Sequence, residues 1–146
     1  MRIGPAALMH DVGKIGVSDR VLLKPGPLTS AERREMERHP DVGRDILSGS
    51  EAPLLQLAEV IAWTHHEKVD GSGYPRGLRG DEIPLAGRIT AVADVFDALT
   101  RDRPYRAAMP VESALRIMVD GRGSHFDADV LDAFLASVPV NGVASA

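Results

Sequence analysis

The chain has 146 residues and no cysteine, which suits one domain and excludes disulfides, thiolate metal sites and a cysteine nucleophile. The absence of cysteine fits a reducing compartment, and we expect a cytoplasmic protein. The formal charge of −4 argues against duplex nucleic acid as a partner, and no apolar run reaches the about 18 residues of a membrane span.

Apolar residues recur at helical spacing along the chain without strand-like alternation, which predicts an all-α fold. The first expected helix is short and apolar, from residue 3 to about residue 12. A long connector over residues 13–27 follows it. Thr29 and Glu32 then have the spacing of a capping box, which predicts that a polar helix begins there.

The middle of the chain has further helix boundaries that can be predicted from proline. His39 precedes Pro40, so the polar helix should end or bend at this point. The following helix is expected to reach about Leu47. Pro53 suits the first turn of the next helix, whose C-terminal end carries the adjacent histidines at 65–66.

The second half begins with an irregular segment over residues 70–84 that is rich in glycine. Apolar spacing predicts a helix over residues 85–100. Another helix is expected over residues 110–121, after a basic break. Asp127 is placed to cap a last helix that runs through Leu135.

Seven polar side chains at or near apolar helices carry groups that bind metal ions. They are His10, Asp11, His39, His65, His66, Asp94 and Asp97. Each alone has an ordinary explanation as surface polarity or a helix end, but together they would leave costly unpaired groups beside an apolar core. Nitrogen and oxygen ligands without sulfur suit Fe, Mn, Zn, Co or Ni. By contrast, His125 is expected to be structural and Trp63 to lie in the core.

Two pairs of these residues are adjacent in the sequence, His10 with Asp11 and His65 with His66. Neighbours on a helix diverge by roughly 100°, so an adjacent pair aims poorly at a single ion. Such pairs would serve two ions about 3.5–4 Å apart, bridged by an aspartate. The sequence therefore predicts a multinuclear site beside a glycine-containing loop that a large ligand can approach.

Six motifs also occur in an order that is typical of one family. They are MHDVGKIGV, KPGPLT, ERHPDVG, HHEKVDGSGYPRGL, RITAVADVFDALT and RDRPYR. From Ala6 to about Phe134, the chain resembles the HD-GYP domain, the branch of the HD metal-dependent phosphohydrolases that degrades cyclic di-GMP. The resemblance implies an HD-type helical bundle over residues 1–138, followed by a flexible tail at 139–146.

The resemblance implies a role for each matched residue. The implied metal ligands are His10, Asp11, His39, His65, His66 and Asp94. Asp11, which would bridge ions, and Lys14, which would contact the scissile phosphate, are the implied catalytic residues. The implied substrate-binding residues are Lys14, Gly73, Tyr74, Pro75, Arg103 and Arg106. Asp97 and Glu67 are expected to contact metal-binding residues rather than the ions.

The implied activity is metal-dependent hydrolysis of cyclic di-GMP to linear pGpG, with GMP as a further product. Two or three divalent ions would be required, with Fe or Mn favoured and Zn, Co or Ni as alternatives. The implied partners are cyclic di-GMP and a regulatory domain or diguanylate cyclase-type protein. A homo-oligomer is also compatible with the resemblance.

The chain departs from the family's pattern at its start. The family places a helix before the HD pair that supplies a further metal-binding histidine, and residues 2–9 contain no His, Asp or Glu. We therefore expect an N-terminally truncated domain with weak hydrolysis. Two alternatives stay open: a catalytically impaired module that binds cyclic di-GMP or protein partners, and an HD phosphohydrolase that acts on another nucleotide.

Overall fold

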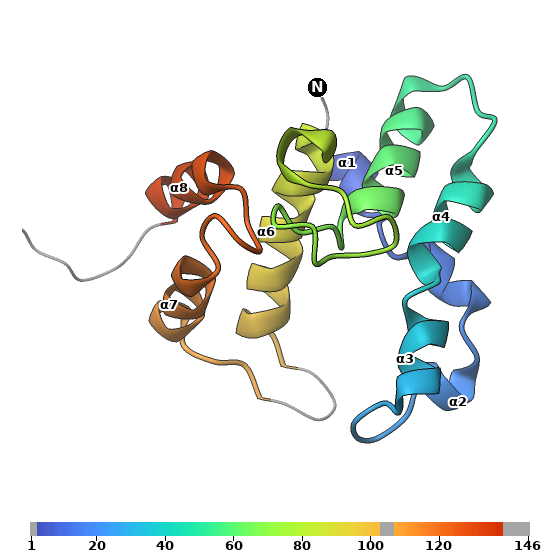
Figure 1. The fold of residues 1–146 in the computed structure, drawn as a ribbon, viewed down its shortest axis with the longest axis horizontal. Helices are drawn as coiled ribbons and strands as arrows, with labels where there is room; N and C mark the ends of the chain where they lie inside the picture. The colour runs from blue at the N-terminus through green and yellow to red at the C-terminus, as the bar shows by residue number, and fades with distance from the viewer. Residues whose placement is uncertain (1–2, 103–106, 139–146) are drawn as a thin grey trace, which may run out of the picture.

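The structure is a computed structural model that describes residues 3–102 and 107–138 (Figure 1). Over these residues the chain is all-α, as predicted, and no strand forms. Its elements are α1 (Ile3–Ala7), the 3₁₀ helix η1 (Val12–Gly16), α2 (Asp19–Leu22), α3 (Ser30–Met36), α4 (His39–Leu47), α5 (Pro53–Thr64), the 3₁₀ helix η2 (Gly80–Glu82), α6 (Leu85–Thr100), α7 (Val111–Asp120) and α8 (Ala128–Ser137). The predicted tail, Arg103 and Arg106 lie outside the described residues.

Several helix boundaries follow from local signals in the sequence. At the start of α3, the Thr29 hydroxyl accepts from the Glu32 amide at 3.3 Å, and the Glu32 carboxylate accepts from the Thr29 amide at 2.8 Å. This reciprocal pair satisfies two amides that a helix start leaves unpaired. Asp127 caps α8 in the same way by accepting from the Val130 amide at 2.9 Å. The predicted capping residues are therefore confirmed.

The expected helix over residues 3–12 is shorter in the structure, because α1 ends at Ala7. A series of tight turns follows and leads into η1, which lies against α4. A Cβ on Gly13 would lie 1.9 Å from the His39 carbonyl oxygen and 2.4 Å from the Gly43 amide, so only glycine permits this close approach. Tertiary packing therefore overrides the helical spacing here, and the expected connector contains η1 and α2.

The core consists of two apolar clusters on either side of α6, which lies between α5 and the α7–α8 pair (Figure 1). The first joins α1, α4, α5 and the start of α6, and its buried members are Ala6, Leu47, Ala58, Ile61, Ala62 and Ala86. The second has Val92, Met118, Phe126 and Leu131 as buried members. Among the described helices, none has the length and apolar character required to cross a membrane.

Candidate metal centre

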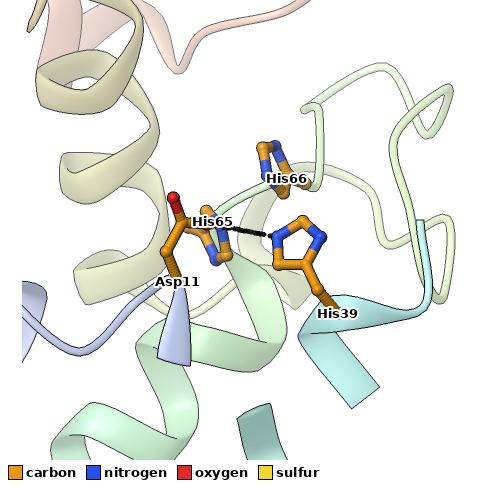
Figure 2. A group of neighbouring side chains, drawn as sticks. All are labelled: Asp11, His39, His65 and His66. Atoms are coloured by element: carbon orange, nitrogen blue, oxygen red, sulfur yellow. Dashed lines mark hydrogen bonds and ion pairs between the residues drawn. The ribbon is translucent and has the colours of Figure 1, made fainter. Parts of the chain in front are cut away.

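Four potential metal ligands from three separate segments meet beside α6 (Figure 2). Asp11 directly precedes η1, His39 begins α4, and His65 and His66 directly follow α5. One ligand atom from each residue lies within 4.8 Å of the corresponding atoms of the other three. The packing of α4 against both η1 and α5 brings the segments together.

Backbone carbonyls determine which nitrogen of two histidine rings faces the centre. Nδ1 of His39 lies 2.8 Å from the Met36 carbonyl oxygen, and Nδ1 of His65 lies 3.0 and 3.1 Å from carbonyl oxygens of α5. A carbonyl only accepts hydrogen bonds, so each Nδ1 carries the hydrogen. In the neutral ring Nε2 is then an unprotonated ligand atom. Burial lowers the pKa of His39, which favours this neutral form.

The two Nε2 atoms converge on one oxygen of Asp11. Oδ1 of Asp11 lies 3.4 Å from Nε2 of His39 and 3.7 Å from Nε2 of His65, and the two nitrogens are 3.4 Å apart (Figure 2). This oxygen is buried and has no hydrogen-bond partner. Three converging lone pairs are costly without a cation, and imidazole nitrogen with carboxylate oxygen is a set that transition metals accept. The residues therefore fit a divalent metal ion.

The other oxygen of Asp11 faces a different set of residues. Oδ2 lies 2.5 Å from Nζ of Lys14 and 3.4 Å from Nε2 of His10. The same His10 nitrogen lies 3.5 Å from Oδ1 of Asp94 on α6. Asp11 thus stands between two groups of ligands and reaches each with a separate oxygen. This is the position that a carboxylate bridging two ions requires.

The charges of this second group are strongly coupled. Hydrogen bonds to Asp11 and Asp94 raise the pKa of His10 to about 10. Burial opposes the ionisation of Asp11, but its contacts with His10 and Lys14 hold its pKa well below the usual range. In the metal-free protein His10 is therefore a cation between two carboxylates, and a metal ion would take the place of its proton.

Metal binding should consequently release a proton from His10. A pKa of about 10, raised from 6.5, means that protonated His10 stabilises the metal-free fold below pH 6.5 and that this contribution is lost as the pH rises through 10. At pH 8 the ring must lose its proton to bind an ion. Calorimetry of Mn²⁺ binding in buffers of different ionisation enthalpy should show about one proton released per protein. A buffer-independent enthalpy would place His10 outside the metal site.

The loop after the paired histidines is attached to the site through its backbone. The carboxylate of Glu67, which is 2% exposed, accepts from the amides of Arg76 at 2.8 Å and Leu78 at 2.9 Å. A Cβ on Gly73 would lie 2.4 Å from the Lys68 amide nitrogen, so the loop packs closely only with glycine there. The Glu67 carboxylate thus holds the loop, and its contact with a metal-binding side chain stays a prediction.

Tyr74 in this loop covers one face of His66. The two rings stack with centroids 4.8 Å apart and planes 22° from parallel, and the Tyr74 amide donates to the His66 carbonyl at 3.2 Å. Burial lowers the pKa of His66 to about 3 and also raises the pKa of the Tyr74 hydroxyl, so both rings are neutral at physiological pH. Pro75 follows directly, which places the three residues Gly-Tyr-Pro beside the paired histidines.

A recess of about 370 Å³ opens on the other side of the centre, next to His10 and Asp94. Asp97 and Arg101 lie in its wall. The carboxylate of Asp97 pairs with Nε of Arg101 at 2.5 Å and contacts no histidine among the described residues. Arg101, directly after α6, thus takes this carboxylate, and the support of a ligand histidine by Asp97 stays a prediction.

The structure brings most of the predicted site together: His10, Asp11, Lys14, His39, His65, His66, Gly73, Tyr74, Pro75 and Asp94. The sequence interpretation missed the backbone carbonyls that orient the rings and the attachment of the loop to Glu67. The ring orientation could have been inferred where a histidine follows a helical turn, because the carbonyl three residues before it is then in reach of Nδ1. No local signal in the sequence indicates that the loop is attached to Glu67.

The chain matches the family model of the HD domain over residues 1–130. It therefore belongs to the HD domain family. Among similar proteins, it is 52% identical over 130 residues to the "Cyclic di-GMP phosphodiesterase" of Thermotoga maritima, covering 89% of this chain and 35% of that protein. It is equally identical to the "Cyclic di-GMP phosphodiesterase response regulator RpfG" of Xanthomonas campestris, covering 89% and 34%.

A third relative has a name that specifies another nucleotide. The chain is 45% identical over 130 residues to "3'3'-cGAMP-specific phosphodiesterase 2" of Vibrio cholerae, covering 89% of this chain and 25% of that protein. The chain thus spans between a quarter and about a third of the length of these curated relatives. The family membership agrees with the resemblance to the HD-GYP branch.

Proposed function

We propose that this protein is a metal-dependent phosphodiesterase that hydrolyses cyclic di-GMP to linear pGpG, with GMP as a further product. The observation that carries the proposal is the two-sided position of Asp11. One oxygen meets the Nε2 atoms of His39 and His65, and the other meets His10 and Lys14. A carboxylate between two ligand groups supports a site with two or three divalent ions, and donors without sulfur favour Fe or Mn.

Different side chains would have different roles in the reaction. Asp11, His39, His65 and His66 would hold one ion, and Asp11 would join this group to His10 and Asp94. A bound divalent ion polarises a phosphate oxygen and lowers the pKa of bound water. Lys14 places a positive charge at Oδ2 of Asp11, where it can stabilise the negative charge that develops on a phosphate. The ring of Tyr74 stacks on His66 beside this group.

The choice of substrate rests on the relatives. Relatives that are 52% identical have names that state cyclic di-GMP, whereas one that is 51% identical is named "3'3'-cGAMP-specific phosphodiesterase 3". Sequence identity alone therefore does not decide which of the two nucleotides is the substrate, and 3'3'-cGAMP is the second candidate. A regulatory domain, a diguanylate cyclase-type partner and a homo-oligomer remain predictions from the family resemblance.

The proposal is tested by incubating Mn²⁺- or Fe²⁺-loaded protein with each cyclic dinucleotide and separating the products by chromatography. We expect pGpG from cyclic di-GMP, and a slower reaction with 3'3'-cGAMP. Faster cleavage of 3'3'-cGAMP would change the substrate but keep the reaction. Binding of either nucleotide without any product, at full metal content, would contradict the enzyme and favour a binding module.

The two arginines of the RDRPYR motif should contribute to nucleotide binding. They lie outside the described residues, so this prediction comes from the resemblance alone. Arg103→Ala and Arg106→Ala should each weaken binding of a non-hydrolysable phosphorothioate analogue by about tenfold or more, because a charge-assisted hydrogen bond contributes about 1.5–3 kcal/mol. Metal content should not change. Arg116→Ala, on the exposed surface of α7, is the control, and wild-type affinity in both variants would move the phosphate site elsewhere.

A further inference from the structure

Trp63 near the end of α5 is partly exposed and joins three elements, although its sequence position suggested the core. Its indole N–H donates to the Asp41 carboxylate on α4 at 2.9 Å. The guanidinium carbons of Arg44 on α4 and Arg76 in the loop lie 4.7 and 4.2 Å from the ring centroid. These distances are within the range of cation–π contacts, so the ring holds a side chain from the loop against two helices.

The three joined elements all carry parts of the candidate metal centre. His39 begins α4, His65 directly follows α5, and Arg76 lies two residues after Tyr74. Trp63 therefore lies where the two ligand-bearing helices and the loop meet.

The two arginines on this ring are not equivalent. The Arg44 guanidinium also pairs with the neighbouring Asp45 carboxylate, whereas the Arg76 guanidinium forms no ion pair within the described part of the chain. The loop is thus attached near residue 76 in two ways. Glu67 binds the backbone amide of Arg76, and Trp63 binds its guanidinium. Loss of either attachment should let the Tyr74 ring move away from His66.

We propose that Trp63 is a positioning residue that holds Arg76 and thereby sets Tyr74 over His66. The attachment of the loop is a property of the fold alone. Its consequence for nucleotide binding rests on the proposed function. A cation–π contact at an exposed site changes the equilibrium between an attached and a detached loop by about two- to fivefold.

Hydrogen–deuterium exchange measures this equilibrium directly, because the amides of Tyr74, Arg76 and Leu78 are hydrogen-bonded to the His66 carbonyl and the Glu67 carboxylate. In Trp63→Leu, exchange at these amides should be about two- to fivefold faster, while α7 and α8 exchange as in the wild type. Trp63→Phe keeps an aromatic face and should restore slow exchange. Arg76→Leu, an exposed change that tests the contact without altering the helix, should match Trp63→Leu.

Arg44→Leu is the matched control, because it removes the other arginine from the same ring and should leave loop exchange unchanged. The affinity for the phosphorothioate analogue should also fall in Trp63→Leu and Arg76→Leu, by at most the factor by which exchange rises, because only the attached fraction binds. Exchange at the wild-type rate in both Trp63→Leu and Arg76→Leu would show that the contact between Trp63 and Arg76 does not attach the loop. Faster exchange with unchanged nucleotide affinity would overturn the positioning role. Absence of hydrolysis by the wild-type protein, with these exchange and affinity changes present, would count against the proposed reaction and leave the role of Trp63 standing.

Discussion

Replacement of Asp11 with asparagine should lower cyclic di-GMP hydrolysis by at least about a hundredfold. Asparagine keeps the shape of the side chain but removes the charge that faces both ligand groups. Metal-ion stabilisation of a phosphoryl transition state is worth several kcal/mol, and about 2.7 kcal/mol corresponds to a hundredfold change in rate. Bound metal, measured by elemental analysis, should fall together with the rate.

The same substitution should also change His10. Asp11 is the largest cause of the raised pKa of His10, so the pKa should fall in Asp11→Asn, where only Asp94 and the Ala7 carbonyl still raise it. Histidine titration followed by NMR measures this shift. Asp19→Asn on α2 is the control for loss of a carboxylate away from the centre. Hydrolysis within threefold of the wild type in Asp11→Asn would contradict the bridging role.

Replacement of His65 or His66 with alanine should lower metal content and hydrolysis together while the helical circular dichroism largely remains. Substitution of a residue that only orients a metal ligand commonly lowers metal affinity or activity by about 10–100-fold, so loss of a ligand itself should have at least that effect. His65 should be the more sensitive of the two, because its Nε2 faces both Asp11 and His39.

His125→Ala supplies the matched control for these variants. This fifth histidine stacks on Phe126 with centroids 4.1 Å apart and has no place in the four-residue ligand cluster. The substitution removes the same kind of side chain, an imidazole, without changing a proposed ligand. Full metal content in both His65→Ala and His66→Ala, equal to that of His125→Ala, would show that the adjacent histidines are structural.

The sequence predicted helix boundaries where local chemistry determines them. The capping box of Thr29 with Glu32, the cap at Asp127 and the apolar stripe over residues 85–100 all correspond to observed elements. The first helix was predicted too long, because its end depends on contact with α4 rather than on local propensity. Gly13 permits that contact, and nothing within residues 3–12 indicates it.

The sequence indicated which residues would lie together at the candidate site, but not how they are arranged. Apolar context and the family motifs indicated the same histidines and aspartates that the fold brings together. The separate roles of the two Asp11 oxygens depend on ring orientations that backbone carbonyls set. The attachment of the loop to Glu67 could not be predicted, because its partners are loop amides nine and eleven residues away. Trp63 was assigned to the core because its side-chain partners on α4 and in the loop could not be identified from spacing.

Anomalous X-ray diffraction from crystals saturated with Mn²⁺ tests the central claim most directly. We predict a metal peak bonded to Nε2 of His39, Nε2 of His65 and Oδ1 of Asp11, because these atoms converge without hydrogens between them. A second peak is predicted where Oδ2 of Asp11 meets His10 and Asp94. A metal-saturated crystal with no anomalous peak among these residues, and with Oδ1 of Asp11 hydrogen-bonded to a protonated histidine, would contradict the assignment of this cluster as a metal centre.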